Sequence, residues 1–303
     1  MMMTHFPWKR ALHSKAVWFS LMVMAGFALT AVLGPWLAPQ DPYRWGATQA
    51  DLPPVWVNDG PKAPQADFPL GSDRYGRDIL SRLLFGTRTA FFLALLSVPL
   101  AGLVGTLVGL TAGYAGGKVD AGLSLLMDMI QSLPGIMFLV MLVLILRSVL
   151  TPSWFHGLIA LVFGFAAVAW VSLARLIRVQ VMVLKAQLFV EAAVSVGATP
   201  WQIITRHLLP NVSHLIIAWV INNVPAVILI EAVVGYIGIG VTSAETDNAF
   251  SVISWGGMFF SGRSALTRSP LMVVIPSVSI LLISMSCILL GDFLKGISRP
   301  EAQ

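Results

Sequence analysis

The sequence predicts an all-α integral membrane protein with six transmembrane helices. Of its 303 residues, 57% are hydrophobic and only 11% are charged, whereas soluble domains carry about 25% charged residues. The mean hydropathy is +0.82. Six apolar runs reach the length of about 20 residues that a helix needs to cross a bilayer. This composition excludes an ordinary soluble enzyme and a disordered chain.

All six runs are predicted as helices, because strands of a membrane barrel have about ten residues of alternating polarity. The predicted spans are Ala16–Ala38, Thr89–Ala115, Ala121–Leu146, Gly157–Ala174, Leu215–Gly240 and Leu271–Leu290. The first run has a core of about 23 residues. A signal peptide has a core of roughly 7–15 residues, so the first run is predicted to remain in the protein as a span.

The distribution of basic residues predicts that both chain ends lie in the cytoplasm. With the N-terminus inside, the inner segments carry ten Lys and Arg against four Asp and Glu, and the outer segments carry nine against eight. Basic residues favour the cytoplasmic side of a membrane, so the protein is predicted to be N-in and C-in. No run of five or more Lys and Arg occurs, and nucleic-acid binding is therefore not expected.

Residues suited to catalysis or metal binding are sparse. Cys287 is the only cysteine and the five histidines form no cluster, so neither an internal disulfide nor a metal site is expected. The stretch Gly113–Lys118 lacks the spacing of a phosphate-binding loop, and Val119 follows the lysine where Ser or Thr is required. An intramembrane Ser–His protease is not expected, because His156 and His214 lie at span ends. We therefore expect neither enzyme activity nor a cofactor in this chain.

The outer loop from Pro39 to Arg88 begins rich in proline. In Asp78–Gly86 the apolar residues recur at helical spacing, which predicts a short amphipathic helix at the membrane interface. Arginines and acids alternate in this loop, which favours local ion pairing over an anion site. They are Asp73, Arg74, Arg77, Asp78, Arg82 and Arg88. Trp36 and Trp255 are predicted to anchor the outer membrane interface.

The inner loop between the fourth and fifth spans contains the signals of a short, separate helix. Gly197 is suited to end one helix, and Thr199 followed by Pro200 is suited to cap and begin another. Pro210 is predicted to end this second helix after about ten residues, a length that is not stable alone in water. Such a helix needs a groove on a partner in which to lie.

The spacing of side chains in this short helix predicts how it would meet that partner. Trp201, Ile204 and Leu208 recur at one face of a helix and form a predicted apolar contact surface. Gln202 and Arg206 provide a polar flank.

The inner loop resembles the EAA loop of permease subunits of bacterial ABC importers. The matching residues are Glu191, Ala192, Ala193, Gly197, Leu209 and Pro210. Four further stretches occur in the order of the dipeptide and oligopeptide branch of this family: Leu37–Pro42, Pro69–Arg82, Glu231–Gly240 and Leu290–Asp292. The resemblance covers nearly the whole chain.

The resemblance implies a type I ABC importer permease fold in the bacterial inner membrane. Residues 1–88 would hold the tail, first span and long outer loop, residues 89–293 the permease core with its EAA loop at about 185–211, and residues 294–303 a cytoplasmic tail. The short helix would be the coupling helix that docks on an ATPase subunit. The residues assigned to coupling are Glu191, Ala192, Ala193, Gly197, Thr199, Pro200, Trp201, Ile204, Arg206, Leu209 and Pro210.

The implied partners are a second permease subunit in a heterodimer, two cytoplasmic ATPase subunits that bind ATP and Mg, and an extracytoplasmic solute-binding protein. The implied solute is a dipeptide or oligopeptide, with nickel chelates or another small solute as the alternative. The outer loop 241–270 is longer than in the family pattern and lacks its proline-rich stretch, which leaves the solute open. A secondary transporter without an ATPase is the remoter alternative, and it would leave the EAA loop unexplained.

Two acidic residues lie within predicted spans, where an ionisable group is costly and indicates either pairing or function. Asp128 is interpreted as a gate or packing residue and Glu231 as the better candidate for the solute pathway; a structural ion pair or hydrogen bond is the competing interpretation for both. Gly105, Gly109 and Gly113 have the spacing of close helix packing. Their partner could be a helix of this chain or of the second permease.

Overall fold

The computed structural model describes residues 14–57, 62–150, 157–240 and 252–298. Within these ranges the regular elements are helices, which confirms the all-α prediction. They are α2 (Lys15–Leu37), α3 (Ile79–Ala115), α4 (Gly117–Gln131), α5 (Gly135–Leu150), α6 (Leu158–Lys185), α7 (Leu188–Ser195), α8 (Pro200–Gln202), the π-helical η1 (Ile203–Leu208), α9 (Leu209–Ile237), α10 (Trp255–Gly262) and α11 (Leu271–Ser298). Parts of the predicted N-terminal region 1–88, of the predicted C-terminal tail 294–303 and of the loop 241–270 fall outside the described residues.

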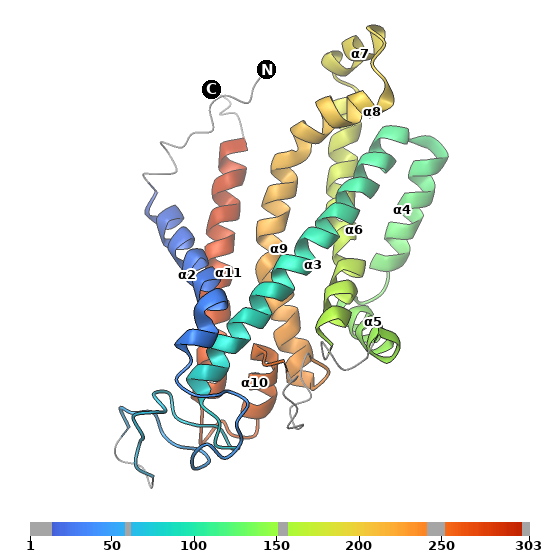
Figure 1. Ribbon diagram of the computed structural model, residues 1–303. Coiled ribbons are helices and arrows are strands. Elements are labelled where there is room, and N and C mark those ends of the chain that lie inside the picture. Colours follow the sequence, from blue (N-terminus) through green and yellow to red (C-terminus); the bar gives the residue numbers. More distant parts are fainter. Residues whose placement is uncertain (1–13, 58–61, 151–156, 241–251, 299–303) are drawn as a thin grey trace.

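The long helices form a bundle with distinct ends. The beginning of α2 and the end of α11 point toward the end that carries α7 and α8, whereas α10 and the outer loop lie at the opposite end (Figure 1). This arrangement agrees with the N-in, C-in prediction, because it puts the inner loop on the same side as the beginning of α2 and the end of α11.

Among the described residues, five helical segments are each long and apolar enough to cross a membrane, and the number rises to six if α4 and α5, which are bent by 90° at their break, count as one span. The prediction of one uninterrupted helix over Ala121–Leu146 is therefore wrong. The helix breaks between Gln131 and Gly135. Pro134 lies in this break, and proline disfavours the helical conformation of the residue before it and cannot donate a backbone hydrogen bond.

The predicted interfacial helix over Asp78–Gly86 is not a separate element, because these residues begin α3. Asp78 caps the helix by accepting a 2.7 Å hydrogen bond from the Ser81 backbone N–H. A Cβ added at Gly34 would lie 3.0 Å from the Leu84 carbonyl oxygen, and one at Gly86 would lie 2.5 Å from Trp255. The apolar face predicted to contact lipid is thus covered by α2 and α10.

The centre of the bundle is the contact between α3 and α6. A Cβ added at Gly105, Gly109 or Gly113 would lie 2.7–2.8 Å from a backbone carbonyl oxygen of α6, closer than real Cβ atoms come. The three glycines therefore allow two helices of the same chain to pack backbone to backbone.

Candidate functional site

The inner loop begins with α7, which ends where Gly197 adopts a left-handed conformation with φ of +88°. The Ala198 N–H donates to the Ala193 carbonyl, and the Gly197 N–H donates to the Val194 carbonyl. These are the two bonds of a glycine-terminated helix end, in agreement with the sequence prediction. Glu191 lies in the first turn of α7, where a carboxylate interacts favourably with the helix dipole.

The next helix begins with a complete capping box. The Gln202 backbone N–H donates to the Thr199 hydroxyl at 3.3 Å, and the Gln202 side chain accepts from the Thr199 backbone N–H at 2.9 Å. Pro200 occupies the first helical turn. The loop between α7 and α8 is therefore a defined turn.

The prediction that Pro210 ends this helix is wrong, because α8 continues through η1 into α9. The Leu209 N–H donates to the Ile204 carbonyl, five residues earlier. In an α-helix the ring of Pro210 would meet the carbonyl of Arg206, and a local π-helical turn is a common way to accommodate such an interruption. The inner loop is consequently joined to α9 without a flexible link.

The predicted apolar face is only partly available to a partner. Leu208 is fully buried and Ile204 is partly buried in the hydrophobic core, whereas Trp201 is 73% exposed. Two residues of the inner loop that were not singled out in the sequence are even more exposed, Leu188 at 81% and Val196 at 90%. Leu188, Val196 and Trp201 are therefore the most exposed large apolar residues of the inner loop.

A groove of 540 Å³ lies between α7 and the segment α8–η1. Its lining combines small apolar residues with polar ones: Phe189, Ala192, Ala193, Val196, Gly197, Ala198, Gln202, Arg206 and His207. Of the residues assigned to coupling, Leu209 and Pro210 lie instead at the start of α9 and are half-buried. The inner loop thus presents both protruding side chains and a groove.

Two ion pairs join α4 to α6. Asp128 Oδ1 lies 2.5 Å from Arg175 Nη2, and their side chains are 65% and 42% exposed. Asp120 accepts hydrogen bonds from Arg178, and these side chains are only 14% and 27% exposed. Sequence reasoning missed Arg175, because the fourth span was predicted to end at Ala174 where charge begins. The helix continues to Lys185, and two of its arginines pair with the acids of α4.

Glu231 is 1% exposed and lies against the beginning of α10. Its Oε2 accepts a 3.2 Å hydrogen bond from the Gly256 backbone N–H. A Cβ added at Gly235 would lie 2.4 Å from the Gly256 Cα, so α9 and α10 are in backbone contact. The structure places Glu231 as a cap that holds α10 on α9.

Trp255 does not anchor the membrane interface as predicted. It is 1% exposed, and its indole N–H donates to the Leu83 carbonyl at 3.2 Å. The Thr89 hydroxyl donates to the Ile253 carbonyl at 2.6 Å. These bonds attach the beginning of α10 and the residues just before it to α3, and they explain why the tryptophan is turned inward.

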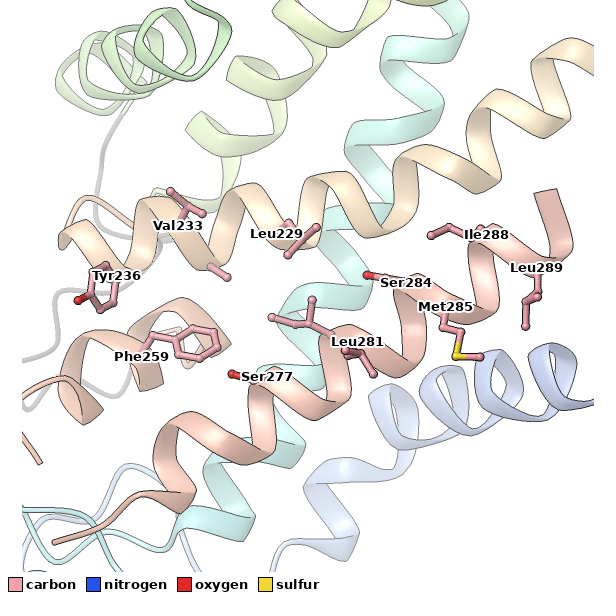
Figure 2. A pocket seen from close by; sticks show the side chains of 12 residues that line it. Leu229, Val233, Tyr236, Phe259, Ser277, Leu281, Ser284, Met285, Ile288 and Leu289 are labelled. Carbon is pink, nitrogen blue, oxygen red and sulfur yellow. The ribbon is translucent and has the colours of Figure 1, made fainter. Parts of the chain in front are cut away.

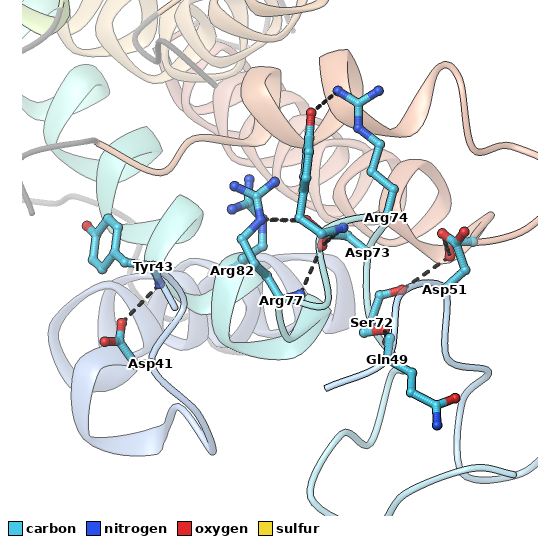
Figure 3. Close-up of polar contacts among 11 residues, drawn as sticks. Asp41, Tyr43, Gln49, Asp51, Ser72, Asp73, Arg74, Arg77 and Arg82 are labelled. Atoms are coloured by element: carbon cyan, nitrogen blue, oxygen red, sulfur yellow. Dashed lines mark hydrogen bonds and ion pairs between the residues drawn. The ribbon is translucent and has the colours of Figure 1, made fainter. Parts of the chain in front are cut away.

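The outer loop folds around a buried ion pair (Figure 3). Asp73 Oδ2 lies 2.7 Å from Arg77 Nε and 3.9 Å from Arg82 Nε. The Arg77 guanidinium also lies over the rings of Trp45 and Tyr75. The expected local pairing of these arginines is present for Arg77 and Arg82.

A second groove, of 760 Å³, lies between α9 and α11 near α10 (Figure 2). The residues that line it are uncharged, and most are aliphatic. Tyr236, Ser277 and Ser284 contribute its hydroxyl groups (Figure 2). Such a lining suits an acyl chain or an apolar helix face better than a charged solute.

Comparisons with known proteins agree with this architecture. Residues 105–302 match the family described as binding-protein-dependent transport system inner membrane component, and residues 7–54 match the N-terminal TM domain of oligopeptide transport permease C. The chain is 31% identical to the di/tripeptide transport system permease protein DppC of Pseudomonas aeruginosa (strain UCBPP-PA14), over 97% of this chain and 91% of the relative. It is 30% identical to the probable D,D-dipeptide transport system permease protein DdpC of Escherichia coli (strain K12), over 93% and 87%.

Among solved structures, an inward-facing conformation of the MetNI methionine ABC transporter matches with a TM-score of 0.53 and 18% identity, over 72% of this chain and 97% of that chain. This likeness shows a shared fold. Together with the family match over most of the sequence, it establishes that this chain belongs to the family of binding-protein-dependent transport system inner-membrane components, the multi-pass permeases of ABC importers.

Proposed function

We propose that this chain is the permease subunit through which an ATP-driven importer moves dipeptides or oligopeptides into the cell. An extracytoplasmic binding protein delivers the peptide, and a second, different permease completes the pathway. Two partner ATPase subunits bind ATP and Mg and hydrolyse the nucleotide. The peptide solute is supported by the relatives, which are named as dipeptide, di/tripeptide and oligopeptide permeases.

The observation that carries the coupling role is the continuous helix from the inner loop to the outer end. The exposed Trp201 lies at one end of the segment Pro200–Ile237, which runs without a break through η1 and α9. At the other end, Glu231 and Gly235 hold α10. A movement imposed on the inner loop by closing ATPase subunits is therefore transmitted to α10 as a rigid-body motion.

The proposal is tested by placing the same backbone strain on either side of the membrane. Gly197 and Gly46 both have positive φ, +88° and +63°, and neither has an atom within 4 Å of an added Cβ. Gly197→Val therefore strains the inner loop and Gly46→Val strains the outer loop, by about 1–2 kcal/mol each, without a steric clash.

In the reconstituted importer, Gly197→Val is expected to lower binding-protein-stimulated ATPase activity and peptide uptake, while Gly46→Val leaves the stimulated ATPase activity close to that of the unmodified complex. Equal losses in both variants, or no loss in Gly197→Val, would contradict a coupling role for the inner loop.

A further inference from the structure

The buried ion pair of the outer loop contains more positive than negative charge. Asp73, Arg77 and Arg82 are 0%, 4% and 5% exposed, and both guanidinium groups lie within ion-pair distance of the same Asp73 oxygen (Figure 3). Two guanidinium groups against one carboxylate give the three side chains a net charge of +1. A buried charge without a counter-charge is costly, because it has lost its hydration.

The Asp73 carboxylate does not satisfy both arginines. Its Oδ1 accepts hydrogen bonds from the backbone N–H groups of Tyr75 at 2.8 Å and Arg77 at 2.9 Å, and its Oδ2 accepts one from Arg77 Nε at 2.7 Å. Arg82 Nε lies 3.9 Å from Oδ2, which is too far for a hydrogen bond. Within the described part of the chain, Arg77 Nη2 and Arg82 Nε are buried donors without an acceptor.

The neighbouring acids do not supply the missing negative charge. Asp78 caps the first turn of α3, and Asp41 is exposed and accepts a hydrogen bond from the Tyr43 backbone N–H. Among the carboxylates of the described residues, Asp73 is the one that interacts appreciably with Arg82. The excess charge therefore calls for an acceptor from outside these side chains.

The surroundings of the free donors suit a small ion. The Arg77 guanidinium lies over the rings of Trp45 and Tyr75, 5.3 and 4.7 Å from their centroids, and stacking on a ring leaves the N–H groups at the guanidinium edge available. Exposures of 4% and 5% for Arg77 and Arg82 leave room for exchange of an ion, but not for a side chain of a second protein. A monovalent anion balances the charge of +1, whereas a divalent one reverses it.

We propose that Arg77 and Arg82 bind one small monovalent anion, either a halide or a free carboxylate of the size of formate. The anion accepts charge-assisted hydrogen bonds from both guanidinium groups and supplies the charge that the cluster lacks. Water could accept the same hydrogen bonds, but it would leave the charge unbalanced. Because Arg77 precedes α3 and Arg82 lies within it, the anion fastens the outer loop to this helix. The inference does not depend on which solute is transported.

The test measures thermal unfolding of the permease pair in detergent, with a cysteine-free partner permease. Cys287 is the only cysteine of this chain and is buried, so its reaction with a fluorogenic thiol reagent reports unfolding of this chain. Sodium gluconate, whose anion is too large for the site, is replaced by chloride or by formate at constant ionic strength.

Chloride or formate is expected to raise the melting temperature with saturation, by about 4 °C at 100 times its dissociation constant. Saturation by one of the two anions identifies the source of the ligand. Sulfate stabilises proteins in general by exclusion from their surface, so its effect is expected not to saturate. If neither chloride nor formate gives a saturating rise, the site is overturned.

Substitutions distinguish the site from a general effect of salt. Arg82→Gln leaves Asp73 and Arg77 as a neutral pair, so it is expected to abolish the saturating rise and to melt in gluconate no lower than the unmodified pair. Arg77→Gln also neutralises the cluster and provides a second variant, should Arg82→Gln not fold. Arg88→Gln is the matched control, because Arg88 lies on the same helix but is exposed, and it is expected to keep the full rise. An equal rise in Arg82→Gln or Arg77→Gln and in the unmodified pair would overturn the anion site.

Discussion

Trp201 offers the sharpest test of the inner loop as a docking surface, because its contribution can be worked out from its exposure. The side chain is 73% exposed, and a buried aromatic side chain covers roughly 150–250 Å². At about 25 cal/mol per Å², covering the exposed part would contribute about 3–5 kcal/mol. Aromatic residues at the centre of interfaces reach about 2–4 kcal/mol when truncated. Trp201→Ala is thus expected to weaken binding of an ATPase subunit roughly 30- to 700-fold.

The assay is a titration of purified ATPase subunits onto the permease pair in lipid nanodiscs, with the dissociation constant as the readout. Trp56→Ala is the matched control, because Trp56 is 61% exposed but lies in the outer loop. It is expected to leave the dissociation constant unchanged. A change of less than about threefold for Trp201→Ala would refute the reasoning, because a well-covered tryptophan contributes far more than that factor.

Three further predictions concern the fold that positions the site. Gly109→Ala would put a Cβ 2.7 Å from the Ala174 carbonyl oxygen, so it is expected to destabilise the protein by about 1–3 kcal/mol in thermal unfolding. Gly26→Ala has open space around the added Cβ and is the control expected to leave the stability unchanged. Glu231→Ala leaves the Gly256 N–H without its acceptor and is expected to cost about 1–3 kcal/mol, while Glu231→Gln, which keeps an acceptor oxygen, is expected to cost less; equal losses would contradict the capping role. Burial raises the pKa of the Asp78 carboxyl above its usual value of 3.8, so the folded protein binds the carboxyl proton more tightly than the unfolded chain does. The stability that protonation of Asp78 contributes is therefore lost as pH rises through the raised pKa. Asp78→Asn keeps a capping side chain without this titration, and its melting temperature relative to the unmodified protein is therefore expected to rise from acidic to neutral pH; a flat difference would contradict it.

Much of the fold was predictable from the sequence because apolar runs of bilayer length allow few structures. The five single-helix spans and the turn at Gly197–Thr199 follow from local chemistry that acts within a few residues. The same local chemistry misjudged Pro210 and the residues after Asp78. In both places a tertiary contact or a π-helical turn allows the helix to extend beyond its sequence signal.

The candidate sites were less predictable, since they depend on which helices meet. Asp128 was recognised as unusual, but its partner Arg175 is 47 residues away and was assigned to a loop. Glu231, predicted as the better candidate for the solute pathway, lies against α10 and accepts a hydrogen bond from the Gly256 N–H. The difference between a buried cap and an exposed ion pair arises from packing, which a single sequence does not display.

Peptide uptake by the complete importer in proteoliposomes tests the central claim most directly. The binding protein and the peptide are placed on the side of the membrane that carries this chain's outer loop, and ATP is placed on the side of its inner loop. We expect uptake that requires both ATP and the binding protein. Uptake by this chain and its partner permease without ATPase subunits, driven by a proton or sodium gradient, would contradict it.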